Sequence, residues 1–367
     1  MLFKPYQLST FTLRNRLVMA PMTTYSSNPD FTVSDEEMVY FKRRAKHLGM
    51  VITAATAVSA QAQAFSLQMS LKDDAYIPSQ RALAKAIQSE GALAVIQLHH
   101  GGRMNVPSLH ADPANIVSAS AIKAERDGVV TPRALETEEV ENVIEDFVAA
   151  LKRAIEAGFD GAELHGANTY LLQQFFSPHS NRRTDRFGGS LDKRMTFAKT
   201  LIERCHQAIK EAGRPFLLGY RFSPEELENP GITLEDTEAL VAMLKTQPLD
   251  FLHVSLGRYH QSSIRDPQDT RKIVDVIQAT LNHAIPLIGV GGIHSKETAE
   301  EALSLGYDLV ATGMSIIADP DWALKIQTGE PLNKIIGSKL LLPTPLYQRL
   351  LNNKPWFERN GYTFEEI

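Results

Sequence analysis

The chain has 367 residues, 43% of them hydrophobic, and a formal net charge of −5. This mildly acidic balance argues against nucleic acid or a membrane surface as a partner, because no basic field would attract a polyanion, and it favours small molecules. The single cysteine, Cys205, excludes an internal disulfide and leaves too few thiolates for an iron–sulfur cluster or a cysteine-based zinc site. No secretion signal or membrane span is recognisable, so we expect a cytoplasmic enzyme.

Short apolar segments rich in β-branched residues alternate with longer amphipathic ones along the whole chain. Strands are expected over 16–20, 50–54, 93–98, 161–164, 216–221, 251–255, 286–290 and 308–312. Helices are expected from the capping box of Ser34 and Glu37 to about Leu48, and over 78–90, 136–157, 191–212, 236–244, 268–282, 297–305 and 321–327. The alternation predicts an α/β protein, a single-domain (β/α)8 TIM barrel over 1–330. The remaining residues, 331–367, form a C-terminal extension packed on the barrel or on a neighbouring subunit.

Four long loops, 61–77, 99–133, 175–190 and 258–267, each follow an expected strand. Loops of this length in a compact domain are usually functional, and in a TIM barrel the loops after the strands build the active face. The side chains just past the strands should therefore face one cavity. These are Thr23, Thr56, Gln97, His99, His100, His165, Arg221, Ser255, Gly291, Gly292 and Gly313.

This set is polar but contains neither a carboxylate nor a lysine. A metal site would need acidic or well-spaced imidazole ligands, and a Schiff base would need a lysine, so both chemistries are disfavoured and no metal is expected. The segment 161–194 is the most informative, because His165, Asn168 and Tyr170 converge where a strand ends. Catalysis is expected there.

Glycines close the last two strands, at Gly289, Gly291, Gly292 and Gly313. TIM barrels commonly bind phosphate at this place through backbone N–H groups, although such glycines can equally serve only tight turns. Arg221, at the end of the fifth strand, adds a fixed cation that suits a delocalised anion such as a reduced flavin.

Six motifs in order resemble the old yellow enzyme family of FMN-dependent ene-reductases and NADH:flavin oxidoreductases. They are LRNRLVMAPMT from Leu13, IQLHHGGR from Ile96, the long segment beginning HGANTYLLQQFFSPHSNRRTDRFGGS at His165, GYRFSP from Gly219, GVGGI from Gly289 and DLVATGMSIIADPDW from Asp308. The resemblance runs from Phe3 to about Trp322.

The resemblance implies FMN across the barrel mouth and NADH or NADPH as a transient electron donor. FMN would contact Pro21, Met22, Thr23, Ala55, Gln97, His165, Arg221, Gly291, Gly292, Gly313 and Met314. His165 and Asn168 would hold a substrate carbonyl oxygen, Tyr170 would protonate the α-carbon, and Tyr25 would border the substrate. The implied reaction is ping-pong hydride transfer from NAD(P)H, by way of FMN N5, to the β-carbon of an α,β-unsaturated carbonyl compound.

Two positions depart from the family pattern. Met314 stands where many relatives have an arginine that contacts the FMN phosphate, so weaker hold of that phosphate is expected. Thr169 stands where glycine is common, and a β-branched residue there is expected to restrict the backbone and shift Tyr170. These departures leave a catalytically degenerate flavin- or ligand-binding barrel as an alternative, beside a metal-dependent barrel hydrolase. The sequence does not indicate the physiological substrate, the preferred nicotinamide or the oligomeric state.

Overall fold

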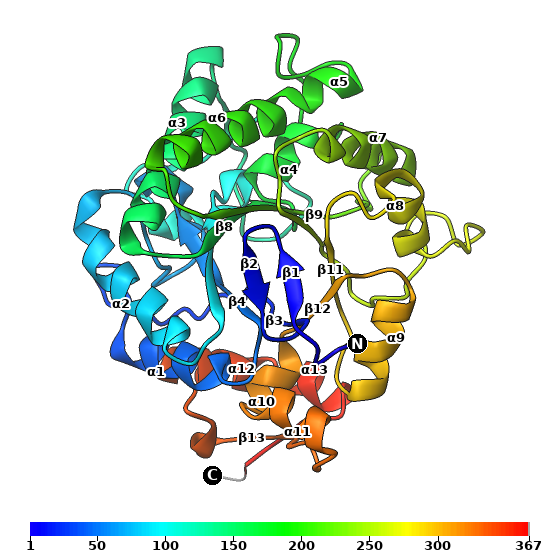
Figure 1. Cartoon of the computed structure of the whole chain (residues 1–367). Coiled ribbons are helices and arrows are strands. Elements are labelled where there is room, and N and C mark those ends of the chain that lie inside the picture. The colour runs from blue at the N-terminus through cyan, green and yellow to red at the C-terminus, as the bar shows by residue number, and fades with distance from the viewer. Residues whose placement is uncertain (366–367) are drawn as a thin grey trace.

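Eight parallel strands close into a barrel at the centre of the molecule (Figure 1) in a computed structural model that describes residues 1–365. The strands follow the order β10-β11-β12-β3-β4-β5-β8-β9 around the barrel. Their bounds are β3 Leu17–Met19, β4 Met50–Ala57, β5 Leu93–His99, β8 Gly161–Gly166, β9 Leu217–Phe222, β10 Phe251–Val254, β11 Leu287–Val290 and β12 Leu309–Thr312. The predicted (β/α)8 barrel is confirmed, and each of the eight expected strands is present.

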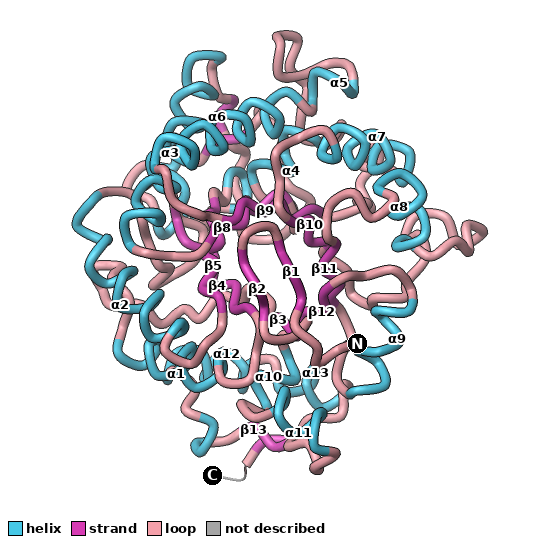
Figure 2. Tube along the Cα trace, viewed as in Figure 1, coloured by secondary structure: helices cyan, strands magenta, loops and turns pink. Residues whose placement is uncertain are grey.

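Helices surround the barrel as an outer ring (Figure 2). Those that follow barrel strands are α1 Asp35–Ala45, α2 Ile77–Gln88, α3 Thr137–Ala157, α6 Thr196–Ala212, α7 Leu234–Lys245, α8 Ile273–Leu281, α9 Lys296–Ser304 and α11 Trp322–Thr328. Ser34 caps α1 and Thr233 caps α7, and in both caps the third helical residue, Glu37 or Asp236, bonds back to the cap. The capping box of Ser34 fixes where α1 begins, as the sequence predicted, and that of Thr233 starts α7 two residues before the expected 236.

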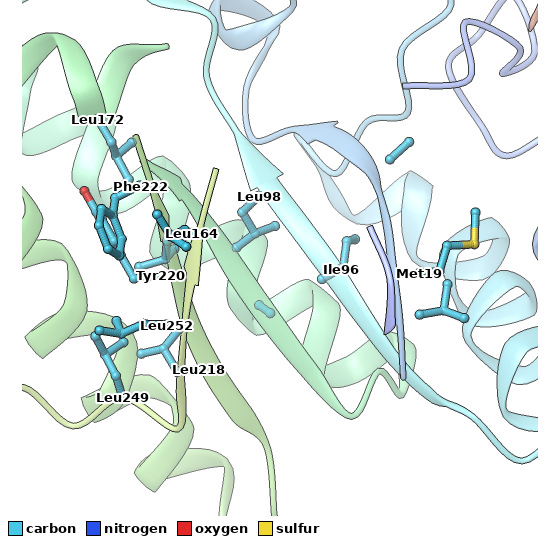
Figure 3. Close-up of a cluster of buried hydrophobic side chains, with 14 of the residues drawn as sticks. Met19, Ile96, Leu98, Leu164, Leu172, Leu218, Tyr220, Phe222, Leu249 and Leu252 are labelled. Carbon is cyan, nitrogen blue, oxygen red and sulfur yellow. The ribbon is translucent and has the colours of Figure 1, made fainter. Parts of the chain in front are cut away.

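Alternating side chains on the strands explain both the core and the site. Outward-facing residues such as Ile96, Leu164 and Leu218 pack under the helices (Figure 3). Polar residues that alternate with them, such as Gln97 and His165, therefore face the inside of the barrel. The apolar layer thus anchors each strand and holds the polar side chains of the strand ends in place.

Two expected helices differ in detail. The segment 191–212 is divided into α5 (Leu191–Arg194) and α6, with Met195 between them. The segment 268–282 becomes helical only at Ile273, because the carboxylates of Asp266 and Asp269 accept hydrogen bonds from backbone N–H groups two residues on. Such local turns compete with helix formation.

Several elements were not predicted. They are the antiparallel hairpin of β1 (Tyr6–Leu8) and β2 (Phe11–Leu13), the short pairs β6 (Val117–Ser118) with β7 (Arg133–Ala134) and β13 (Ile335–Ile336) with β14 (Thr363–Phe364), and the helices α4 (Leu171–Phe176), α10 (Met314–Ala318), α12 (Thr344–Asn352) and α13 (Lys354–Arg359). The hairpin lies over the amino-terminal mouth of the barrel in Figure 1, where Leu8 and Leu13 join the apolar cluster inside it.

The C-terminal segment 331–365 contacts the barrel at several points. Arg44 of α1 is buried and donates to the carbonyl of Leu340, while the Tyr362 hydroxyl lies 3.4 Å from Ser315 Oγ in α10. Between these two contacts, the guanidinium of Arg349 in α12 lies 3.9 Å from the centre of the Tyr25 ring. Among residues 1–365, none of the helices is both long and apolar enough to cross a membrane.

Candidate active site

A cavity of about 490 Å³ opens at the carboxyl ends of the barrel strands. Its lining includes seven of the residues that the sequence predicted for the cofactor, namely Pro21, Met22, Arg221, Gly291, Gly292, Gly313 and Met314. Residues of the C-terminal segment complete the wall, namely Lys334, Trp356, Asn360 and Tyr362. Side chains from the first strand to the last and from the segment beyond the barrel thus meet around one space.

His165 is a neutral hydrogen-bond donor at the end of β8. Its side chain is buried, and burial, with smaller contributions from the neighbouring His99 and the positively charged Arg221, holds its pKa well below the usual range. The backbone N–H of Ala167 donates to its Nδ1 at 3.4 Å. Because Nδ1 acts as the acceptor, the proton of the neutral ring is assigned to Nε2, which is left to donate to a bound oxygen.

Tyr170 stands against His165 in a cluster of rings. Its ring centre lies 5.0 Å from that of His165, 4.4 Å from that of His99 and 5.9 Å from that of Phe65. Burial, the largest cause, raises the pKa of Tyr170 to about 12. The phenol therefore keeps its proton at neutral pH, which suits a proton donor.

Asn168 is exposed at the rim of the site and is held by two serines. Its backbone N–H donates to Ser223 Oγ at 2.9 Å, and Ser255 Oγ donates to its Oδ1 at 2.8 Å. Arg221 Nη2 in turn donates to Ser255 Oγ at 3.1 Å. With Oδ1 engaged in this chain of bonds, the amide presents its Nδ2 donors to a ligand.

A buried carboxylate lies beneath the strand ends. Glu163 Oε1 accepts from Gln97 Nε2 at 2.7 Å, and Glu163 Oε2 lies 2.7 Å from His253 Nδ1. All three side chains are buried. Burial, the largest cause, lowers the pKa of His253, so the ring is neutral and donates its Nδ1 proton to Glu163. We call Gln97, Glu163, His253 and Arg221 the floor of the site.

The floor fixes how Gln97 and Arg221 meet a ligand. Since a carboxylate only accepts, Gln97 must turn its Nε2 toward Glu163 and is left with its Oε1 acceptor. Arg221 is buried, and its Nε has no hydrogen-bond partner among the described residues. Burial lowers its pKa, and the negative charge of Glu163 opposes this shift. An unpartnered buried N–H of a cation calls for an anionic or acceptor group from a ligand.

The other predicted site residues lie around this centre. Ala55 of β4 is paired with Gln97 of β5, and Thr23 follows β3 in the loop after Met22. Tyr25 lies further out, where its ring meets Phe65 edge-on with centres 5.5 Å apart. Within residues 1–365, no group of three or more His, Cys, Asp or Glu side chains is arranged to hold a metal ion.

Comparison with known proteins is decisive for the family. Residues 1–333 match the NADH:flavin oxidoreductase / NADH oxidase family. The chain belongs to this family.

Individual relatives agree with this assignment. The chain is 42% identical over 363 residues to the probable NADH-dependent flavin oxidoreductase YqiG of Bacillus subtilis, with 97% of each chain covered. It is 41% identical to the NADH:fumarate oxidoreductase of Klebsiella pneumoniae, where the match covers 95% of this chain but only 38% of that larger protein. Morphinone reductase superposes with a TM-score of 0.78 at 29% identity over 90% of both chains. The old yellow enzyme homologue of Zymomonas mobilis gives 0.80 at 25% identity, over 94% and 98% of the two chains.

As a member of the old yellow enzyme family, the chain has two residues that depart from the family pattern, Thr169 next to Tyr170 and Met314 in the lining of the cavity. Thr169 adopts a φ of +66° and Asn168 a φ of +56°, both in the left-handed region that disfavours β-branched side chains. Tyr170 nevertheless packs against His165. The expected shift of Tyr170 by Thr169 stays a prediction. Met314 lines the cavity beside Gly313 and contributes no charge.

Several residues of the site in this family member were not predicted from the sequence. Glu163 and His253 lie one layer below the strand ends, and only residues at or past those ends were predicted. The period of two would have found Glu163, because it precedes His165 by two residues on the same strand. Phe65 and Arg349 come from a loop and from α12, where no pattern predicts contact with Tyr25.

Proposed function

We propose that this chain is an FMN-dependent NAD(P)H oxidoreductase that reduces the conjugated C=C bond of α,β-unsaturated carbonyl compounds. One observation carries the proposal: a neutral His165 and a protonated Tyr170 stand with ring centres 5.0 Å apart, and His165 is paired across β8 and β9 with Arg221, the buried cation that lines the cavity. The first is a donor for a carbonyl oxygen, and the second is a donor of a proton.

The chemistry of reduction needs both groups. Donors from His165 Nε2 and Asn168 Nδ2 on the carbonyl oxygen withdraw electrons from the alkene and make its β-carbon electrophilic. Tyr170 then gives its proton to the α-carbon, which carries negative charge as the β-carbon accepts hydride. A pKa of about 12 keeps Tyr170 loaded with this proton between turnovers.

The cavity fits a flavin mononucleotide. Gln97 offers an acceptor and Arg221 an unpartnered Nε donor, which suit the imide edge and the delocalised negative charge of a reduced flavin. At the far end, a side chain added at Gly292 would meet no atom within 4 Å, so its backbone is open to a ligand. When bound, FMN would supply hydride transfer between NAD(P)H and the substrate, in a ping-pong cycle.

NADH is our choice of donor. The relatives at 36–42% identity include proteins named NADH-dependent flavin oxidoreductase, NADH:fumarate oxidoreductase, NADH:acrylate oxidoreductase and NADH oxidase. Their names differ in the electron acceptor, but all of them name NADH. Since the chain spans 38% of the fumarate and 34% of the acrylate enzyme, those acceptors carry less weight for this chain. A cytoplasmic location would give access to NADH.

The test is the visible spectrum of the purified protein under anaerobic conditions. We expect a flavin absorption band that NADH bleaches faster than NADPH and that returns on addition of 2-cyclohexenone. A band that bleaches but does not return with any enone would support the degenerate flavin-binding alternative. A colourless protein that takes up no added FMN would overturn the proposal and leave the hydrolase alternative.

A further inference from the structure

The end of the cavity at β11 and β12 is shaped by glycines. Gly291 and Gly292 adopt φ values of +106° and +69°, which L side chains rarely adopt. A Cβ at Gly313 would lie 2.9 Å from Met22 Sδ, which is too close for a real side chain. Gly291 and Gly313 thus pack closely against the Leu256 carbonyl and Met22, whereas a Cβ at Gly292 would meet no atom within 4 Å. The Gly292 backbone is therefore open to a compact group, and Met314, which also lines the cavity, brings no charge.

The cavity is lined by three basic residues besides Arg221, namely Arg258, His294 and Lys334. The backbone N of Arg258 would lie 2.8 Å from a Cβ at Gly291, and His294 follows Gly292 by two residues. Among the described lining residues there is no aspartate or glutamate to neutralise them. Basic side chains around bare backbone, without a carboxylate, favour a compact anion such as a phosphate.

The backbones of the two full cations are fixed. The backbone N–H of Arg258 donates to Gln261 Oε1 at 2.9 Å in the loop after β10. The carbonyl of Lys334 accepts from the N–H of Thr363 at 2.9 Å, next to the paired strands β13 and β14. Within residues 1–365, neither side chain has a carboxylate oxygen within 4.0 Å. Both charges are thus available to a ligand.

We do not assign Arg221 to the binding of this anion, because it belongs to the floor. Its Nη2 donates to Ser255 Oγ at 3.1 Å, and its charge faces Glu163. The cavity therefore carries two separate positive regions, one at the floor and one at the glycines.

Lys334 lies just beyond the part of the chain that matches the family, which ends at residue 333. It belongs to the C-terminal segment whose Trp356, Asn360 and Tyr362 also line the cavity. Tyr362 joins this wall to Ser315 of α10, with 3.4 Å between the hydroxyl oxygens. The basic end is therefore built jointly by the barrel and by a segment outside the family match.

We propose that Arg258 and Lys334 bind the phosphate of FMN at Gly291, Gly292 and Gly313, and that the C-terminal segment is thus part of the cofactor site. This inference rests on the proposed function, because it takes FMN as the ligand. It replaces the expectation that the phosphate is held chiefly by backbone N–H groups.

The test compares FMN with riboflavin, which lacks only the phosphate. The dissociation constants of both are measured with flavin-free protein by quenching of flavin fluorescence. We expect Arg258→Gln and Lys334→Gln each to weaken FMN binding about 10-fold or more, as loss of a charge-assisted bond implies. The dissociation constant of riboflavin should stay within about twofold of its value in the unchanged protein, because riboflavin has no phosphate for the removed side-chain charge to bind.

Lys339→Gln is the matched control, since Lys339 is an exposed lysine of the same segment and does not line the cavity. It should leave both flavins unaffected. Adding Met314→Arg to the Arg258→Gln, Lys334→Gln double variant should recover most of the lost FMN affinity, because it returns a cation to the same place.

The possible failures are distinguishable. If the double variant binds FMN as tightly as the unchanged protein, the assignment of these cations is wrong. The assignment is also wrong if the double variant loses affinity for FMN and riboflavin equally, because the side chains would then support the fold and would not bind the phosphate. If the unchanged protein binds neither flavin, the proposed function itself fails together with this inference.

Discussion

The floor and the rim of the site are built in opposite ways. The floor, made of Gln97, Glu163, His253 and Arg221, comes from barrel strands and is buried; Gln97 and His253 hydrogen-bond to the Glu163 carboxylate, and Arg221 faces its charge. The rim, made of Tyr25, Phe65, Tyr170 and Arg349, comes from loops and α12 and is held by ring contacts. The floor is thus part of the fold, whereas the rim is attached to it. Changes in the floor should cost stability, and changes in the rim should alter turnover.

The largest effect is expected from Glu163→Ala. It removes the acceptor of both Gln97 and His253 and leaves the Arg221 charge buried without its counter-charge. We expect the free energy of unfolding in urea to fall by about 3–5 kcal/mol. Glu163→Gln is the control and should lose less, because its amide oxygen still accepts one bond. A loss below about 1 kcal/mol for Glu163→Ala would show that the floor is not structural.

Tyr170→Phe, in the rim, should lower turnover and cost little stability. It removes the proton donor of the rim but keeps the ring contacts with His99 and His165. We expect the reoxidation of reduced flavin by 2-cyclohexenone to slow about 100-fold or more, while reduction by NADH keeps its rate. Stopped-flow absorbance measures the two half-reactions separately. If neither rate changes, Tyr170 is not the donor.

The buried histidines in and around the site predict that the stability of the protein depends on pH. Burial lowers the pKa of His99 and His100 to about 3 and also lowers the pKa values of His165 and His253. Below the ordinary value of about 6.5, the unfolded chain therefore binds protons that the folded chain does not. Stability should fall with falling pH, by about 1 kcal/mol for each such histidine per pH unit.

Urea unfolding at pH 7.5, 6.5 and 5.5 measures this loss. Replacing one buried histidine, in His99→Gln, should make the slope shallower. The control His260→Asn changes an exposed histidine and should leave the slope unchanged. Constant stability from pH 7.5 to 5.5 would contradict the neutral state of the buried imidazoles, and with it the donor role of His165.

The smallest effect is expected from Thr169→Gly at the rim. Thr169 has a φ of +66°, which glycine adopts without strain, so stability should rise by about 0.5–1 kcal/mol. The neighbouring Ala167→Gly is the control and should destabilise, because Ala167 is buried and does not have a positive φ. Enone turnover should change less than with Tyr170→Phe. A destabilised Thr169→Gly would show that the threonine side chain supports the rim.

The difference between the regions also explains what the sequence could predict. The eight strands and their order follow from apolar runs, and the capping boxes at Ser34 and Thr233 fix helix starts, because these signals are local. His165 and Arg221 were found because they end strands. Their proximity on neighbouring strands is a consequence of the barrel, since parallel strands bring their carboxyl ends together.

The rest depends on contacts between distant parts of the chain. Arg349 reaches Tyr25 across more than 300 residues, and Lys334 joins Gly292 only because Arg44 and Tyr362 anchor the C-terminal segment. Local patterns contain no information on such contacts. Glu163 was missed for another reason: it sits inside a strand, where an acidic residue has no place unless its partners on neighbouring strands are known.

The hairpin of β1 and β2 has a consequence for how ligands enter the enzyme. Leu8 and Leu13 fill the amino-terminal end of the barrel, and the described cavity opens at the carboxyl ends of the strands. Under the proposed function, the nicotinamide and the molecule to be reduced would enter at this same end in turn. Rising concentrations of one should slow the entry of the other, so the enzyme would respond to the ratio of its two substrates as well as to the amount of each.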